Sequence, residues 1–235
     1  MVKHYTDLIN KKTHMEGEML MSLIPDDTAS SVFLDPQYDG VLEKLSYGNE
    51  GERQKGRATL RKMPKELIQN FCNEIDRVLK PSGHLFLWVD KFHLVQATAL
   101  EWSKNTELEV VGLITWDKKS FGMGYRTRAT SEHLLIFQKK PLRAKDVWTD
   151  RSIRDIWRFE HEEEMSSVIP EKIDKPRSGH PHKKPIGLIQ RLINATTVEG
   201  DLILDPAAGS FLVKDACENT GRNFIGCDIE KEYCK

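Results

Sequence analysis

Two apolar runs, far apart in the chain, each end in an aspartate followed by proline. The runs are Val32–Leu34 and Leu202–Leu204, and the acids are Asp35 and Asp205. Short apolar runs bounded by turn residues are typical of buried strands in an α/β sheet, and such sheets bind ligands outside the carboxyl ends of their strands. We therefore expect the two acids to face one crevice in which two ligands can meet.

The composition fits a single compact domain over residues 1–235, because 39% of the residues are hydrophobic and 30% are charged. No apolar stretch approaches the roughly 18 to 20 residues that cross a bilayer, and the N-terminus lacks the apolar core of a signal peptide. The four cysteines show no CxxC or ligand-like spacing, which predicts reduced, mostly structural thiols. These features favour a cytoplasmic protein.

Charge is distributed unevenly although the formal net charge is only -1. Residues 39–62 carry many charges and glycines with little apolar periodicity, which predicts a long, mobile basic loop directly after Asp35. Across residues 52–65 a single acid, Glu52, stands against the basic side chains of Arg53, Lys55, Arg57, Arg61, Lys62 and Lys65. We expect this loop to contact phosphate groups; the simpler alternative is a solvated charged loop.

Apolar runs and amphipathic segments alternate along the chain. A short strand near residue 13 leads into a helix that starts at Gly17-Glu18 and runs through residue 24. Further strands are expected at 31–34, 85–89, 108–116, 132–137, 202–204 and 224–227, and helices at 64–79, 91–102, 185–195 and after 210. This order predicts an α/β fold with a mostly parallel twisted sheet, helices on both faces and an antiparallel strand at 132–137. Residues 140–183 are predicted to be irregular.

The segment that begins at Asp205 predicts a ligand-binding turn between a strand and a helix. Its small residues Ala207, Ala208 and Gly209 allow a ligand to approach the backbone at the start of the helix. Asp228 ends the next predicted strand, where an acid binds ribose hydroxyls in nucleoside-cofactor folds. Together they favour a cofactor that carries adenosine; the alternative is two structural turns, one with a helix-capping aspartate.

On these motifs the chain resembles the S-adenosylmethionine-dependent DNA amino-methyltransferases, which methylate adenine N6 or cytosine N4. Their pattern is acid-Pro-Pro-aromatic together with Asp-Pro-Phe-x-Gly-Ser-Gly. The chain departs from it at Gln37, at Ala207 in place of Phe and at Phe211 in place of the last Gly. The catalytic motif precedes the cofactor motif, as in the circularly permuted beta branch, which implies a Rossmann-like methyltransferase fold in permuted order.

The resemblance extends over most of the sequence. Trp116-Asp117-Lys118, Gly122-Met123-Gly124, His133 and the segment 180–185 also match. Because the chain runs from the strand before Gly17 to just past Asp228, we expect it to supply every central strand and to be nearly complete.

The resemblance implies a catalytic role for Asp35, Pro36, Gln37 and Tyr38. The Asp35 carboxylate and the backbone carbonyl of Pro36 or Gln37 would accept hydrogen bonds from the target amine, and Tyr38 would stack on a base flipped out of the duplex. The residues expected to bind the cofactor are Asp205, Pro206, Ala207, Gly209, Ser210, Phe211, Asp228, Lys184, Pro185 and Glu18. Glu18 is equally well explained as a helix-start glutamate.

DNA is the expected partner, with a possible homodimer and no membrane or metal. Phosphate contacts are assigned to Arg53, Lys55, Arg57, Arg61, Lys62, Lys118, Arg126 and Arg128, and residues 140–183 form a short insertion of the kind that reads target sequence. His180 and His182 form an HxH that could suggest metal, but methyl transfer from a sulfonium needs no Lewis acid. Trp148 and Trp157 fit packing and base stacking equally well.

An aspartate in first place of the catalytic motif resembles the adenine-modifying members, so the expected activity is methylation of adenine N6. The alternatives are cytosine N4, an RNA or protein amide, and a catalytically silent subunit that binds DNA or cofactor. The resemblance implies a bacterial or phage-encoded protein that is associated with the nucleoid, with restriction-modification as the expected biological context.

Overall fold

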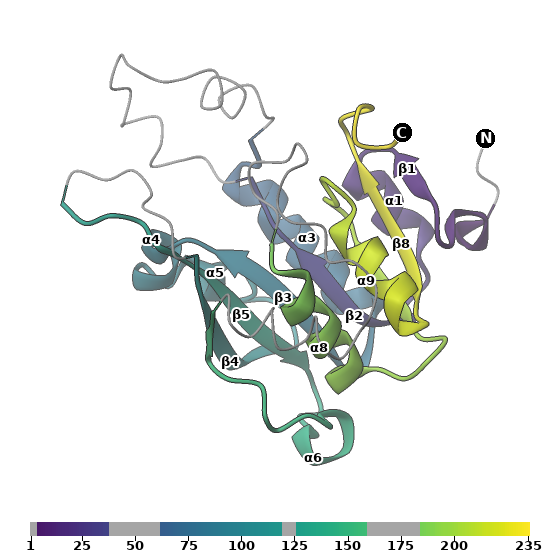
Figure 1. Cartoon of the computed structure of the whole chain (residues 1–235). Coiled ribbons are helices and arrows are strands. Elements are labelled where there is room, and N and C mark those ends of the chain that lie inside the picture. Colours follow the sequence, from purple (N-terminus) through teal and green to yellow (C-terminus); the bar gives the residue numbers. More distant parts are fainter. Residues whose placement is uncertain (1–3, 38–61, 119–125, 159–183) are drawn as a thin grey trace.

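A single mixed sheet forms the centre of the molecule (Figure 1). The computed structural model describes residues 4–37, 62–118, 126–158 and 184–235. Within them eight strands lie in the order β1-β8-β7-β2-β3-β5-β4-β6. The strands are β1 (Lys12–His14), β2 (Ala29–Leu34), β3 (Leu79–Val89), β4 (Leu108–Asp117), β5 (Ser131–Lys139), β6 (Ile156–Trp157), β7 (Leu202–Asp205) and β8 (Asn223–Asp228).

Strand direction follows the expected pattern. Neighbouring strands from β1 through β3 are parallel, β5 is antiparallel to both β3 and β4, and β6 pairs parallel with β4. Every residue of β2 is buried, as a central strand covered on both faces requires. The mostly parallel sheet with an antiparallel strand at 132–137 is therefore confirmed.

Helices cover both faces of the sheet (Figure 1). One hydrophobic core joins the sheet to α1, α3 and α5, and a second core on the opposite face joins it to α8 and α9. The helical segments are η1 (Tyr5–Leu8), α1 (Gly17–Leu23), α3 (Lys65–Val78), α4 (Lys91–Val95), α5 (Thr98–Trp102), α6 (Ala144–Val147), α8 (Ile186–Thr196) and α9 (Leu212–Thr220). No helix among the described residues is long and apolar enough to span a membrane.

The helix α3 illustrates how the sequence builds these layers. Ile68, Phe71, Ile75 and Val78 recur at helical spacing, and all are buried against the sheet. The helix ends at Val78, next to the expected end at 79, but the strand that follows starts at Leu79 and not at 85, because the buried backbone at Leu79 is already extended and pairs with β2. The helix therefore passes into β3 without an intervening loop.

Two other expectations are refined by the structure. The helix expected over 91–102 is two short helices, α4 and α5, separated by Ala97 in the left-handed conformation with φ 54°. All four cysteines are free, and Cys72, Cys217 and Cys227 are buried, in line with structural thiols. Both refinements leave the order of elements unchanged.

The described part of the segment 140–183 lies against the second core. Trp157 is buried in β6, and Trp148 packs on the same cluster while its Nε1 donates to the Asp150 carbonyl over 2.7 Å. Both tryptophans therefore pack the core. Residues 159–183 lie outside the described part of the chain.

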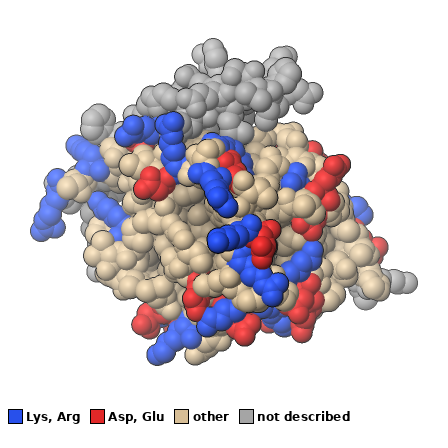
Figure 2. All heavy atoms as spheres, turned by 90° about the horizontal axis from the view of Figure 1, so that it is seen from below, with Lys and Arg blue, Asp and Glu red and all other residues tan. Residues whose placement is uncertain are grey.

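Charges of both signs mix on the face that the amino ends of the parallel strands reach (Figure 2). Two ion pairs lie at this end of the sheet: Lys80, in β3, lies 3.1 Å from Asp201 before β7, and Lys139, at the end of β5, lies 2.9 Å from Asp27 before β2. These two lysines are thus paired with acids.

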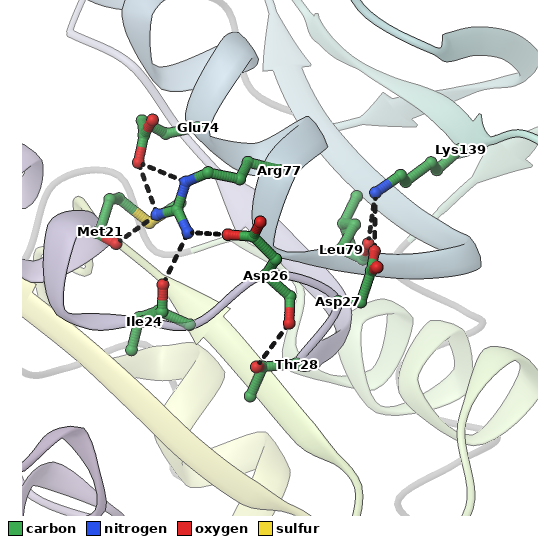
Figure 3. Close-up of polar contacts among 9 residues, drawn as sticks. All are labelled: Met21, Ile24, Asp26, Asp27, Thr28, Glu74, Arg77, Leu79 and Lys139. Carbon is green, nitrogen blue, oxygen red and sulfur yellow. Dashed lines mark hydrogen bonds and ion pairs between the residues drawn. The ribbon is translucent and has the colours of Figure 1, made fainter.

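Arg77, at the end of α3, ties α1 to α3 (Figure 3). Its guanidinium donates to the carbonyl of Met21 over 2.9 Å and to the carbonyl of Ile24 over 2.8 Å, and it pairs with Asp26 and Glu74. These carbonyls lie at the C-terminal end of α1, where the helix offers no further N–H groups to bind them. The Arg77 side chain on α3 thus supplies hydrogen bonds to the carbonyls at the end of α1.

Replacing Arg77 by alanine should lower the free energy of unfolding by about 2 kcal/mol, because the α1 carbonyls and two carboxylates lose a charged donor. Urea unfolding followed by circular dichroism measures the change. Arg143→Ala, at an exposed arginine before α6, serves as the control and should change stability by less than about 0.5 kcal/mol. An equal loss in both variants would contradict the assigned role.

Candidate active site

The two aspartates that end the apolar runs lie beside each other at the carboxyl edge of the sheet. Strands β2 and β7 are parallel neighbours, with Ser31 opposite Ile203 and Val32 opposite Leu204. Asp35 directly follows β2, and Asp205 is the last residue of β7. Burial raises the pKa of Asp205 well above its usual value. The hydrogen bond from the Ala207 N–H lowers this pKa, whereas the nearby charges of Asp35 and Asp228 raise it. The two segments therefore form one site.

The turn after β7 is held by backbone hydrogen bonds to β8. The N–H of Ala208 donates to the Cys227 carbonyl over 2.9 Å, and the N–H of Gly209 donates to Asp228 Oδ2 over 2.8 Å. Gly209 has a φ of 50°, a conformation that glycine adopts without strain. The second oxygen of Asp228 accepts from the N–H of Glu230 over 2.7 Å. Asp228 thus shapes the turn while its carboxylate stays at the site, since each oxygen can accept more than one donor.

A cavity that is open to solvent lies next to this turn. Four residues expected to bind the cofactor line it: Glu18, Pro206, Ala207 and Asp228. Lys62, which was expected to contact DNA phosphates, lines it as well. The walls that the sequence did not indicate are Glu16, Gly17, Met63, Leu67, Phe71 and Ile229. Apolar side chains can cover an adenine ring, and carboxylates can accept ribose hydroxyls. The residues present therefore fit a molecule that carries adenosine.

Gly17 allows α1 to approach the turn closely. A Cβ at this position would lie 2.5 Å from the Pro206 carbonyl oxygen and 2.7 Å from the Phe71 ring. No side chain fits that space without movement of backbone, so the glycine fixes the distance between α1 and the cofactor turn. The signal in the sequence was Gly17 at the junction of a strand and a helix.

Phe211 does not face this cavity. Its side chain is fully buried in the second core, with its ring 6.2 Å from that of Phe224 in an edge-to-face contact. Its backbone is left-handed, with a φ of 59°, at the start of α9. Phe211 stands where the family pattern has glycine. Its backbone keeps the left-handed conformation that glycine adopts easily, and its ring packs in the core.

Lys184, expected near the cofactor, reaches the catalytic motif instead. Its Nζ lies 2.9 Å from Asp35 Oδ2, 2.6 Å from Glu132 Oε2 and 4.8 Å from the centroid of the Trp88 ring. Burial would lower the pKa of Lys184, but the carboxylates of Asp35 and Glu132 outweigh it and raise the pKa. Lys184 is not among the residues that line the cavity.

Glu132, on β5, was not singled out by the sequence analysis. Its other oxygen, Oε1, lies 2.8 Å from the Nζ of Lys118. Burial alone would raise the pKa of Glu132, but the charges of Lys184 and Lys118 lower it to about 2. A charged residue at the start of an otherwise apolar strand was the available signal.

The remaining expected residues are placed as follows. Pro185 is buried directly before α8, Ser210 is half-buried in the turn before α9, and Arg126 and Arg128 are exposed. Tyr38, Arg53, Lys55, Arg57, Arg61, His180 and His182 lie outside the described residues. Within the described ranges, no cluster of three or more His, Cys, Asp or Glu could hold a metal ion.

Changing Glu132 to Gln should lower stability at neutral pH by about 3 kcal/mol. The depressed pKa means that the ionised Glu132 stabilises the fold above its usual pKa of 4.5, and this contribution is lost as pH falls toward 2. Urea unfolding at pH 7, 5, 4 and 3 should therefore show the gap between the wild type and Glu132→Gln closing in acid. Glu109→Gln, at an exposed ion pair with Lys140, should cost less than about 1 kcal/mol. A gap that stays constant with pH would refute the electrostatic origin.

Comparisons with known proteins assign the family. The model of the N6/N4 DNA methylases, described as DNA methylase, matches residues 30–235. The Type II methyltransferase M.HhaII of Haemophilus parahaemolyticus is 52% identical over 227 residues, which cover 96% of this chain and 93% of that relative. The DNA adenine methyltransferase YhdJ of Escherichia coli (strain K12) is 46% identical over 253 residues, which cover 95% and 80% of the two chains.

The fold agrees with a solved structure. The crystal structure of an M1.HpyAVI–SAM complex superposes with a TM-score of 0.62 at 19% identity and covers 95% of each chain. The family match confirms the resemblance to the DNA amino-methyltransferases that was inferred from the motifs at Asp35 and Asp205. The chain belongs to the N6/N4 DNA methylase family, and dependence on S-adenosylmethionine comes with that membership.

Proposed function

We propose that this protein transfers a methyl group from S-adenosylmethionine to N6 of adenine in DNA. The observation that carries the proposal is the position of Asp35, which ends β2 beside the cofactor turn of its parallel neighbour β7. An acceptor held at Asp35 and a donor held at Asp205–Asp228 would meet at one edge of the sheet. Methyl transfer needs such a juxtaposition because the reacting atoms must be aligned.

The chemistry assigned to Asp35 follows from the weakness of the acceptor. The lone pair of an exocyclic amine is delocalised into the base ring, so the nitrogen is a poor nucleophile. Two acceptors that bind both amine hydrogens localise that pair and hold the nitrogen toward tetrahedral geometry. Asp35 would supply one of them. The Gln37 carbonyl already accepts the Met63 N–H over 2.7 Å, which favours the Pro36 carbonyl as the other.

The cavity beside the turn would hold the methyl donor. Asp228 is placed to accept the ribose hydroxyls, and Phe71 and Ile229 to cover the adenine ring. When bound, S-adenosylmethionine supplies an electrophilic methyl group on a positively charged sulfonium. The carboxylate of Asp228 lines this cavity and would attract the positively charged sulfonium.

Adenine is the proposed base because the motif begins with aspartate and YhdJ, named a DNA adenine methyltransferase, is 46% identical. Cytosine N4 is the second candidate, since the family model covers both amines. RNA or protein acceptors are less favoured, because the family is described as DNA methylase. A silent subunit is less favoured, because the Asp35 site and the cavity are both present. The relatives named as Type II methyltransferases support a partner restriction enzyme as a further proposal.

DNA is proposed to approach the carboxyl edge of the sheet. The amino edge carries charges of both signs (Figure 2), whereas Lys62, Lys118, Arg126 and Arg128 belong to segments next to Asp35 or beyond the end of β4. We also propose that Tyr38 stacks on the flipped base, that Arg53, Lys55, Arg57 and Arg61 contact phosphates, and that residues 140–183 read a short or relaxed target. A homodimer would supply additional DNA contacts.

Tritiated methyl transfer to unmodified duplex DNA, followed by nucleoside analysis, tests this function. The wild type should yield N6-methyladenine, and Asp35→Ala should lose about 100- to 1,000-fold in rate because the amine loses its charged acceptor. Asp146→Ala, at an exposed position on α6, should retain activity. N4-methylcytosine as the product would replace the proposed base, and no product on any DNA would reject the function.

Changing Arg126 and Arg128 together to alanine should weaken DNA binding at low salt, because two exposed cations near the end of β4 would no longer displace counterions. The slope of log affinity against log salt should become shallower by about 1 to 2. Fluorescence anisotropy of labelled duplex at several salt concentrations measures both quantities. Arg143→Ala is the single-site control. An unchanged slope would show that these arginines do not contact phosphates.

A further inference from the structure

Lys184 is held between two carboxylates and an aromatic ring at the catalytic edge. Its ammonium lies 2.9 Å from Asp35 after β2 and 2.6 Å from Glu132 on β5, and it faces the ring of Trp88 on β3 at 4.8 Å. The side chain is 12% exposed. Three strands thus fix one cation, and the hydrogen bond to Asp35 restricts rotation of the Asp35 carboxylate.

Other acidic residues end or directly follow the neighbouring strands at this edge. Asp205 ends the neighbouring strand β7, Asp228 ends β8 beyond it, and Asp90 follows β3, where it accepts from His93 over 2.7 Å. Further titratable groups at this edge, within the described part of the chain, include Glu132, Lys118, Lys62, Glu16, Glu18 and His133. Like charges favour the protonated form of a carboxyl group. Among the described residues, Lys184 contacts Asp35 directly, and its positive charge opposes this effect.

A protonated Asp35 could not perform the role assigned to it. A neutral carboxyl group carries its own hydrogen and is a weaker acceptor for the amine of the base. A carboxylate that rotates freely would also lose the fixed direction toward the methyl donor. Ionisation and orientation of Asp35 therefore both require a fixed cation at this distance.

We propose that Lys184 is a positioning residue for methyl transfer, which keeps the Asp35 carboxylate ionised and fixed in orientation and does not bind the methyl donor. This inference rests on the proposed function. Glu132 completes the arrangement, because one of its oxygens binds Lys184 and the other binds Lys118 over 2.8 Å. Glu132 thereby prevents the lysine from turning away toward solvent.

The test compares Lys184→Met and Lys184→Arg with the wild type. Lys184→Met should lower kcat at neutral pH by about 10- to 100-fold, and the acid limb of its pH profile should move to higher pH, because Asp35 then protonates more readily. Affinity for S-adenosylmethionine, measured by calorimetry, should stay within about twofold of the wild type. Lys184→Arg, which keeps the charge, should restore most of the acid limb.

Lys139→Met is the matched control, because Lys139 is equally buried and pairs with Asp27 over 2.9 Å at the opposite edge of the sheet (Figure 3). It should leave the pH profile unchanged. Carbon-13 NMR titration of labelled aspartate carboxyls, without DNA, provides a readout apart from turnover: the pKa of Asp35 should rise in Lys184→Met and stay in place in Lys139→Met.

Two results would overturn the inference. One is an unchanged Asp35 titration and acid limb in Lys184→Met, and the other is a large loss of S-adenosylmethionine affinity, which would place Lys184 at the donor. A wild type that transfers no methyl group would instead overturn the proposed function, and the NMR titration would still decide whether Lys184 keeps Asp35 ionised.

Discussion

The parallel pairing of β2 with β7 is the constraint on which the site depends. The pairs Ser31 with Ile203 and Val32 with Leu204 bring two segments from opposite ends of the chain to one edge of the sheet. Because a one-residue slip would turn every side chain of a strand to the other face, the buried residues of both strands lock this register. Asp35 and Asp205 are adjacent for that reason, and the fold itself sets the distance between the acceptor and donor sites.

Acidic residues at one edge of the sheet repel one another, and lysines at the same edge offset this repulsion. Asp205 is buried beside Asp35 and Asp228, and its raised pKa reflects burial first and those charges second. Lys184 and Lys118 join the same edge through Glu132, whose lowered pKa shows that attraction exceeds the cost of burial. The result is an alternating chain of charges, Asp35, Lys184, Glu132 and Lys118, in which each group stabilises the ionised form of the next.

The sequence predicted the parts of the structure that local pattern controls. Apolar runs located β2 and β7, helical spacing located α3, and the acids after the strands located the site. The contacts of Lys184 could not be predicted, because its partners Asp35 and Glu132 come from distant strands. Its place within the segment 180–185 suggested a role in cofactor binding instead. Glu132 was missed for the same reason: within its strand it looks like an ordinary polar residue until the sheet brings two lysines to it.

The departures from the family pattern fall where the fold can absorb them. Phe211 replaces a glycine but sends its ring into the core against Phe224, away from the cavity, and its left-handed backbone keeps the path of the turn. The left-handed conformation of a non-glycine residue destabilises the fold by about 1 kcal/mol or more. Burial of a phenylalanine ring stabilises it by roughly 2 to 3 kcal/mol. The substitution at Phe211 therefore exchanges backbone strain for core packing and leaves the cofactor side of the turn, at Ala207 and Gly209, open to a ligand.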